Sequence, residues 1–148
     1  ALFYVEGTVK DRKLALPLGL RDCPAATCPA SVESRLAGVS RANIQGNLAG
    51  FRSLFQGCGP GGAGLGFDDL LVSMGAEALA NLMLTRLAAA DAAAAAIEET
   101  DLALALAADP ASVRALYDAL KGVTDLLKAD FITVLNLERP DALDGDND

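Results

Sequence analysis

The chain has 148 residues and a mass of 15.2 kDa, which suits one domain with a single core. Its 12 basic and 20 acidic residues give a net charge of −8, which disfavours nucleic acid and acidic membrane surfaces as partners. Histidine is absent, so this chain has no Ser-His or Cys-His dyad and no histidine metal ligand. Apolar residues make up 52% but aromatic residues only 5%, and this composition favours helices.

The first expected element is a helix from Ala1 to about Leu16, whose apolar residues recur at a helical spacing. Pro17 and Gly19 end it. The chain starts with Ala rather than Met and has no basic leader, so we expect Ala1 to be a product of processing or truncation. The longest apolar run is mainly alanine and contains Asp91, which predicts no transmembrane span.

Two cysteines lie in an irregular, proline-rich connection. Cys23 and Cys28 belong to a segment too rich in proline for a helix and too poor in other donors for a zinc site. A short disulfide loop in an exported protein is the favoured interpretation, and three reduced thiols in a cytosolic protein are the alternative. Cys58 is then a free thiol or a competitor for either partner.

The second expected helix runs from Ser40 to about Gln56. Ser40 is predicted to cap it, because a serine hydroxyl can accept from an amide two or three residues on. Gly46 and Gly50 lower the helix propensity, which predicts a close approach to another helix. The apolar stripe of this helix consists of Ile44, Leu48, Phe51 and Phe55.

The remaining chain is predicted to be helical after a glycine-rich loop. We expect a short helix at Phe67 to Met74, a long one at Ala76 to about Glu99, and a last one from Asp109-Pro110 to about Leu135. Leu102 to Leu106 alternates like a strand but has no partner strand, so it is interpreted as a connection or a helical turn. About four principal helices predict an all-α bundle, with residues 1–148 as one unit and 141–148 as an acidic tail.

Three polar clusters are candidate sites. Asp144 to Asp148 begins like a calcium loop but lacks its closing Glu, and a hydrated tail is the favoured interpretation. Glu98 to Asp101 gathers carboxylates that could serve a metal or acid chemistry, although a solvent-facing helix end is favoured. Amides beside Ser40, Arg41 and Asn43 could hold an anion, although capping accounts for Ser40 without a ligand. We predict no catalytic residue and no metal ligand in this chain.

Three stretches, taken together, resemble the imelysin-like family of bacterial envelope proteins, which is grouped with peptidases and associated with iron acquisition. The first is Val9 to Gly19, followed by Val32-Glu-Ser and the start of the second helix at Val39 to Leu48. The second is Gly64 to Leu71, which opens the next helix. The last is Thr133-Val-Leu-Asn-Leu, ending in Leu143-Asp-Gly-Asp146, which is similar to the family's C-terminal signature.

The resemblance implies the C-terminal half of a domain built from two related helical bundles, with a ligand groove between the halves. The family's Gly-x-His-x-x-Glu motif belongs to the N-terminal half, so the chain alone is not expected to act as a metallopeptidase. Iron or another cation would bind through that half, in a periplasmic or cell-envelope location. Residues expected near the boundary of the halves are Ser40, Arg41, Asn43, Asp144 and Asp146.

The expected partner is therefore a complementary N-terminal half or another helical protein. The alternative to the half-domain is a stand-alone helical module for protein–protein interaction without enzymatic activity. The Cys23–Cys28 disulfide agrees with the export that the resemblance implies.

Overall fold

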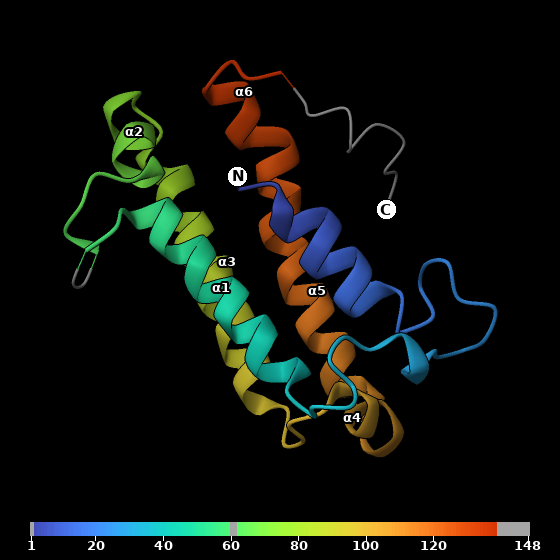
Figure 1. Ribbon diagram of the computed structural model, residues 1–148. Helices are drawn as coiled ribbons and strands as arrows, with labels where there is room; N and C mark the ends of the chain where they lie inside the picture. Colours follow the sequence, from blue (N-terminus) through green and yellow to red (C-terminus); the bar gives the residue numbers. More distant parts are fainter. Residues whose placement is uncertain (1, 60–61, 139–148) are drawn as a thin grey trace.

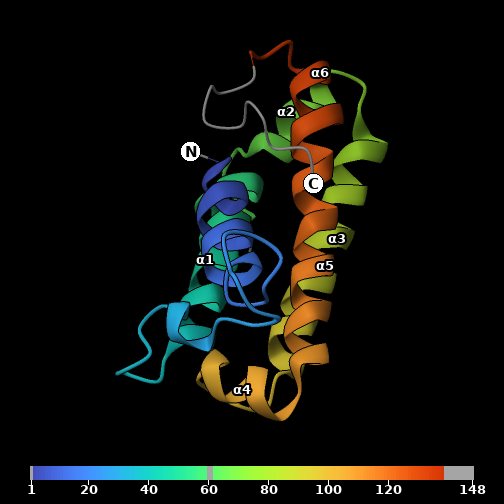
Figure 2. The ribbon, with the colours of Figure 1, turned by 90° about the vertical axis from the view of Figure 1, so that its right-hand side faces the viewer.

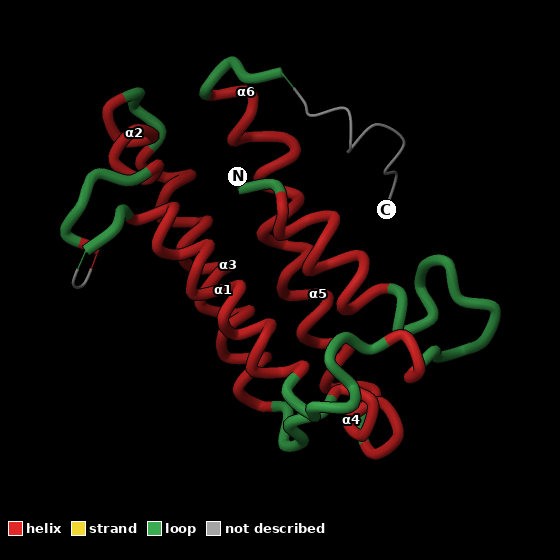
Figure 3. The backbone as a smooth tube through the Cα atoms, viewed as in Figure 1, coloured by secondary structure: helices red, strands yellow, loops and turns green. Residues whose placement is uncertain are grey.

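The computed structural model describes residues 2–59 and 62–138, and within these residues it contains helices and no strands (Figure 3). The elements include two π-helices, η1 and η4, and one 3-10 helix, η2. Their bounds are η1 Val5–Ala15, η2 Pro29–Ser31, α1 Ser40–Gln56, α2 Phe67–Ser73, α3 Glu77–Ala96, α4 Leu102–Ala108, α5 Pro110–Leu126, η4 Leu127–Phe131 and α6 Ile132–Val134.

The long helices η1, α1, α3 and α5 alternate in direction and form an up-down four-helix bundle (Figure 1). Each packs against two neighbours, in the cyclic order η1, α1, α3, α5. Seen from the side, η1 and α1 form one layer while α3 and α5 form the other (Figure 2). The short helices α2 and α4 lie at opposite ends of the bundle. The predicted all-α bundle is confirmed.

The core lies between the four long helices and takes residues from all of them. Its large side chains come from the apolar stripes that a helical period predicts, and they exclude water along the whole bundle. Those buried to 1% exposure or less include Leu14, Ile44, Leu48, Phe51, Phe55, Leu71, Met83, Leu87, Ile97, Leu102 and Phe131.

The first helix has the predicted place but a wider turn than an α-helix. η1 is a π-helix, in which a backbone N–H bonds the carbonyl five residues earlier, and the pattern continues where the Leu16 amide donates to the Asp11 carbonyl at 2.9 Å. Buried side chains consequently recur in groups four or five residues apart: Val5, Glu6, Val9, Lys10, Asp11, Leu14 and Ala15. This broad face allows η1 to contact both α1 and α5.

Capping residues mark the starts of α5 and of the short helix α4 before it. The Asp109 carboxylate accepts from the Ser112 amide at 3.3 Å, with Pro110 at the first helical position, as predicted. Asp101 accepts from the Ala103 amide at 3.0 Å and caps α4 in the same way. Of the two interpretations of Leu102 to Leu106, helix is the one found. Among the described residues, none of the helices combines the length and the hydropathy that a membrane span requires.

The prediction that Ser40 caps α1 is wrong. The N-cap of α1 is Val39, which has no side-chain cap, and Ser40 is the first helical residue. Its buried hydroxyl accepts from the Leu102 amide at 2.8 Å and lies 3.3 Å from a carboxylate oxygen of Asp101. Ser40 therefore satisfies the start of α4 rather than the start of its own helix.

The close helix approach predicted at Gly46 and Gly50 is not found among the described residues. A Cβ on Gly46 would meet nothing within 4 Å, and one on Gly50 would meet only the Tyr4 hydroxyl at 3.6 Å. Both glycines are exposed on the outer face of α1. Within this chain they lower the helix propensity without a compensating contact.

Gly46→Ala is expected to raise the free energy of unfolding of the isolated chain by about 0.5–1 kcal/mol, because alanine is the better helix former and this position is open. Urea denaturation followed by circular dichroism measures the change. A destabilised variant would mean that the position is crowded.

Candidate functional site

The most unusual polar feature is a cluster of charged side chains buried between η1 and η4. Glu6 and Lys10, one turn apart on η1, are both fully buried. A carboxylate oxygen of Glu6, Oε1, lies 2.9 Å from Lys10 Nζ and 2.8 Å from Lys128 Nζ on η4. One carboxylate thus joins η1, the first helix of the bundle, to η4, which follows directly after α5.

The cluster continues along η1 to the connection that follows it. Asp11, which is 7% exposed, lies with Oδ1 3.2 Å from Lys10 Nζ. Its other oxygen, Oδ2, accepts from Arg21 Nη1 at 2.9 Å. We call Glu6, Lys10, Asp11, Arg21 and Lys128 the buried ion network.

A second set of contacts ties η1 to α1 and to the same connection. Lys13 Nζ lies 2.7 Å from Asn47 Oδ1 on α1 and 2.7 Å from Glu33 Oε2. The Tyr4 hydroxyl donates to the Asn47 carbonyl oxygen. The N-terminal helix is therefore held by polar contacts on both of the sides that it presents to the bundle.

The chemistry of the buried ion network is that of positioning. Removing charges from water costs several kcal/mol per ion, and mutual attraction offsets this only when the geometry is good. The ammonium of Lys10 lies against two carboxylates with its side chain fully buried, so a substrate cannot reach it as a nucleophile. We therefore expect the network to fix the position of η1 against η4.

Burial raises the pKa of the Asp11 carboxyl above its ordinary value. The positive charges of Lys10 and Arg21 and the hydrogen bond from Lys10 act in the opposite direction, and the negative charge of Glu6 adds to the rise. Folding therefore favours the protonated form of Asp11.

The free energy of unfolding should consequently rise relative to that of Asp11→Asn as the pH falls from 7 to about 4, where an ordinary Asp titrates. The reason is that the folded state binds this proton more tightly than the unfolded state does. Parallel denaturation curves of both proteins at each pH measure the difference, in which groups common to both largely cancel. A difference that moves in the opposite direction would show that the charged form is the favoured one.

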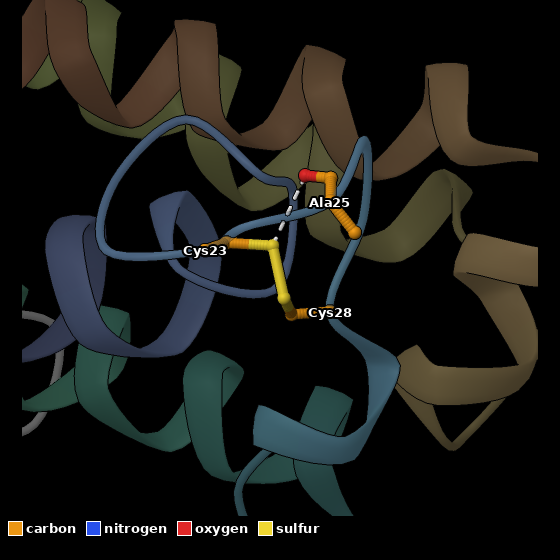
Figure 4. Close-up of a disulfide and its surroundings, with 3 residues drawn as sticks. All are labelled: Cys23, Ala25 and Cys28. Carbon is orange, nitrogen blue, oxygen red and sulfur yellow. Dashed lines mark hydrogen bonds between the residues drawn. A yellow bond between two sulfur atoms is a disulfide. The ribbon is translucent and has the colours of Figure 1, made fainter.

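The connection between η1 and α1 is closed by the predicted disulfide. Cys23 and Cys28 are bonded, with their Cα atoms 6.1 Å apart (Figure 4). Cys23 Sγ also lies 3.1 Å from the Ala25 carbonyl oxygen, a contact without a proton because a disulfide sulfur carries none. Cys58, of the alternatives left open, is a free and exposed thiol beyond the end of α1.

The predicted boundary residues of α1 lie at the end of the bundle formed by α4. Arg41 donates from its guanidinium to the Ile97 carbonyl and, at 3.3 Å, to that of Glu98. Asn43 donates to the Ser34 hydroxyl at 3.0 Å. With Ser40 on Asp101, all three side chains are used to join α1 to neighbouring connections, and their place at a boundary stays a prediction. Asp144 and Asp146 lie outside the described residues.

A pocket of about 210 Å³ lies beside this junction. Its walls combine small apolar side chains with three carboxylates, and the lining residues are Ala96, Ile97, Glu98, Glu99, Ala105, Ala108, Asp109 and Ser112. Glu98 and Glu99 are exposed, as the solvent-facing interpretation predicted. In residues 2–59 and 62–138 no group of three or more Asp, Glu, Cys or His side chains could hold a metal ion.

Sequence reasoning missed the buried ion network entirely. Glu6 and Lys10 have the spacing of an ordinary exposed pair on a helix surface. The available signal was their position directly after Val5 and Val9, which places them beside the apolar stripe. Only a helix with a broad buried face brings both inside.

The chain is thus an up-down helical bundle in which a buried ion network joins η1 to η4. The family model described as imelysin, peptidase M75, matches residues 4–127, and the chain belongs to this family. The match includes Glu6, Lys10 and Asp11 and ends one residue before Lys128. No curated protein and no solved structure matches the chain.

Proposed function

We propose that this chain is the C-terminal half of an imelysin-like protein of the bacterial periplasm or envelope, associated with iron uptake, and that it presents one wall of a ligand groove to an N-terminal half. The observation that carries this proposal is an exposed surface on α1 and α3 that lacks the character of a solvated helix face. We call it the α1–α3 surface.

The α1–α3 surface is made almost wholly of small or apolar uncharged residues. Its members are Ala42, Gly46, Ala49, Gly50, Ser53 and Leu54 on α1, and Ala78, Asn81, Leu82, Thr85, Ala88, Ala89, Ala92 and Ala95 on α3, all of them exposed. The two helices lie side by side and are joined by the Arg52–Asp91 ion pair at 2.6 Å. Besides Asp91, whose side chain is 41% exposed in that ion pair, the exposed charged residues of α3 are Glu77 and Arg86.

Helix α5 shows how a solvated face of the same bundle looks. It exposes two ion pairs at i,i+4 spacing, Arg114–Asp118 at 2.9 Å and Lys121–Asp125 at 3.0 Å. The contrast supports a helical partner on the α1–α3 surface, because small side chains permit close helix packing. Such a partner would also explain why Gly46 and Gly50 occur in α1 although they make no close helix contact within the described part of this chain. Exposed apolar patches of this kind mark interaction sites.

The first test is the intact mass and N-terminal sequence of the native material. An upstream segment carrying Gly-x-His-x-x-Glu, either continuous with this chain or associated with it, is expected. A native protein of 148 residues that sediments as a monomer without such a segment would contradict the half-domain.

The second test places a charge on the proposed interface. Ala88→Arg on α3 is expected to weaken association with the upstream segment by about 3 kcal/mol, roughly a hundredfold in Kd, because it buries an unpaired charge. Ala115→Arg, at an exposed alanine of α5, is the matched control and should leave Kd unchanged. Equal effects of the two variants in sedimentation or calorimetry would refute this surface as the interface.

Catalysis is not part of the proposal for this chain, since the family's histidine motif belongs to the other half. Any iron or other cation, and any peptidase activity, would be supplied with that half. The alternative, a stand-alone interaction module, is supported by the exposed apolar residues around α2, namely Leu65, Leu70, Val72 and Met74. Capture of a partner that lacks the histidine motif would favour it.

A further inference from the structure

The connection between η1 and α1 lies over one end of the buried ion network. Near its start, Arg21 pairs with Asp11 at 2.9 Å. Further along, Glu33 pairs with Lys13 at 2.7 Å. The two η1 partners are largely buried, with side-chain exposures of 10% for Asp11 and 12% for Lys13. The connection thus holds the C-terminal part of η1 at two points.

The disulfide lies between these two points in the sequence and closes a short loop next to Arg21. Cys23 is two residues after Arg21, and the Cys28 amide donates to the Pro17 carbonyl at 2.8 Å, which folds the loop back on its own start. Gly19 lies under the loop with a positive φ of 76°, and a Cβ there would come within 2.3 Å of the Ala26 carbonyl oxygen. The closed loop and the start of the connection are therefore packed backbone against backbone.

We propose that the Cys23–Cys28 loop is a redox-sensitive strap, which holds Arg21 on the buried carboxylate of Asp11 when oxidised and releases it when reduced. The reductant is a protein or small-molecule dithiol. Its thiolate attacks one sulfur of the disulfide to give a mixed disulfide, and its second thiol then displaces the remaining cysteine. The products are two cysteine thiols and one oxidised dithiol.

The strap can be reached by such a reductant. Cys23 and Cys28 are both partly exposed, and Pro24, Ala25 and Ala26 between them are exposed. The long helices do not contain the disulfide, so its reduction frees the loop without cutting a helix of the bundle. After release, Asp11 keeps Lys10 and Glu6 as neighbours but loses the charge of Arg21.

The test compares oxidised and reduced protein, in a Cys58→Ser background that prevents exchange with the free thiol. Reduction should speed hydrogen exchange of the Cys28 and Leu16 amides by roughly tenfold or more, while amides in the middle of α3 and α5 keep their protection. It should also raise the pKa of Asp11, followed by carboxyl-carbon NMR, because a lowering charge has left.

Arg21→Gln provides the matched control. The oxidised variant should already show the higher pKa of Asp11, and reduction should raise it no further. A further rise in this variant, an unchanged pKa in the reduced parent protein, or loss of helical circular dichroism on reduction would overturn the strap. The Cys58→Ser protein, oxidised or reduced, is the parent for every comparison, and Cys23 and Cys28 are both kept, so the disulfide is opened by reduction and not by substitution.

Discussion

Glu6→Gln is expected to lower the free energy of unfolding by about 3–5 kcal/mol, a large part of the stability of an ordinary small domain. The change removes one negative charge from between two ammonium groups, Lys10 at 2.9 Å and Lys128 at 2.8 Å, and leaves buried positive charges with less compensation. The amide has nearly the shape of the carboxylate, so the loss measures charge rather than packing. Urea denaturation at neutral pH gives the value.

Asp118→Asn is the control for Glu6→Gln. It also removes a carboxylate that pairs with a cation four residues away, but both partners are about half exposed. Exposed pairs at this spacing contribute about 0.3–0.5 kcal/mol, so the control should change little. If the two variants lost similar amounts, the Glu6 cluster would be solvated and its role in fixing η1 would be wrong.

Leu87→Ala is expected to cost about 2–5 kcal/mol, because it leaves a cavity in the middle of the bundle. Leu87 is fully buried on α3, and α3 forms the most extensive helix–helix contact of the chain with α5. Thermal or urea unfolding followed by circular dichroism measures the loss.

Leu82→Ala, on the same helix, separates the core from the α1–α3 surface. Leu82 is 41% exposed, so its truncation should cost less than about 1 kcal/mol in the isolated chain. With the upstream segment bound, the same variant should weaken association. A loss of stability equal to that of Leu87→Ala would place Leu82 in the core and remove it from the proposed interface.

The helices could be predicted from the sequence because their signals are local. Asp109-Pro110 starts α5 as expected, and the apolar stripe of α1 lies in the core. Local signals fail where the hydrogen-bond partner of a side chain lies far away in the sequence. Ser40 has the residue type of a cap, but its hydroxyl accepts from the amide of Leu102, far along the chain.

The wide turn of η1 and the buried ion network could not be predicted for the same reason. The i→i+5 bonding of η1 is a choice between two helical ladders, and no residue type in Val5–Ala15 encodes it. The pairing of Glu6 with Lys128 needs the first and last helices to be placed side by side. The cost of Gly46 and Gly50 to the helix predicts a close contact at these positions, but it does not tell whether the contacting helix belongs to this chain.

The meeting of Glu6 with Lys128 also bears on the order in which the bundle folds. Contacts between segments near opposite ends of the chain close the largest loop, whereas the contacts of α1 with α3 and of α3 with α5 join segments that are closer along the sequence. We expect α1, α3 and α5 to form the folding nucleus and η1 to dock after the rate-limiting barrier. Glu6→Gln should then accelerate unfolding and leave the folding rate nearly unchanged, while Leu87→Ala should slow folding.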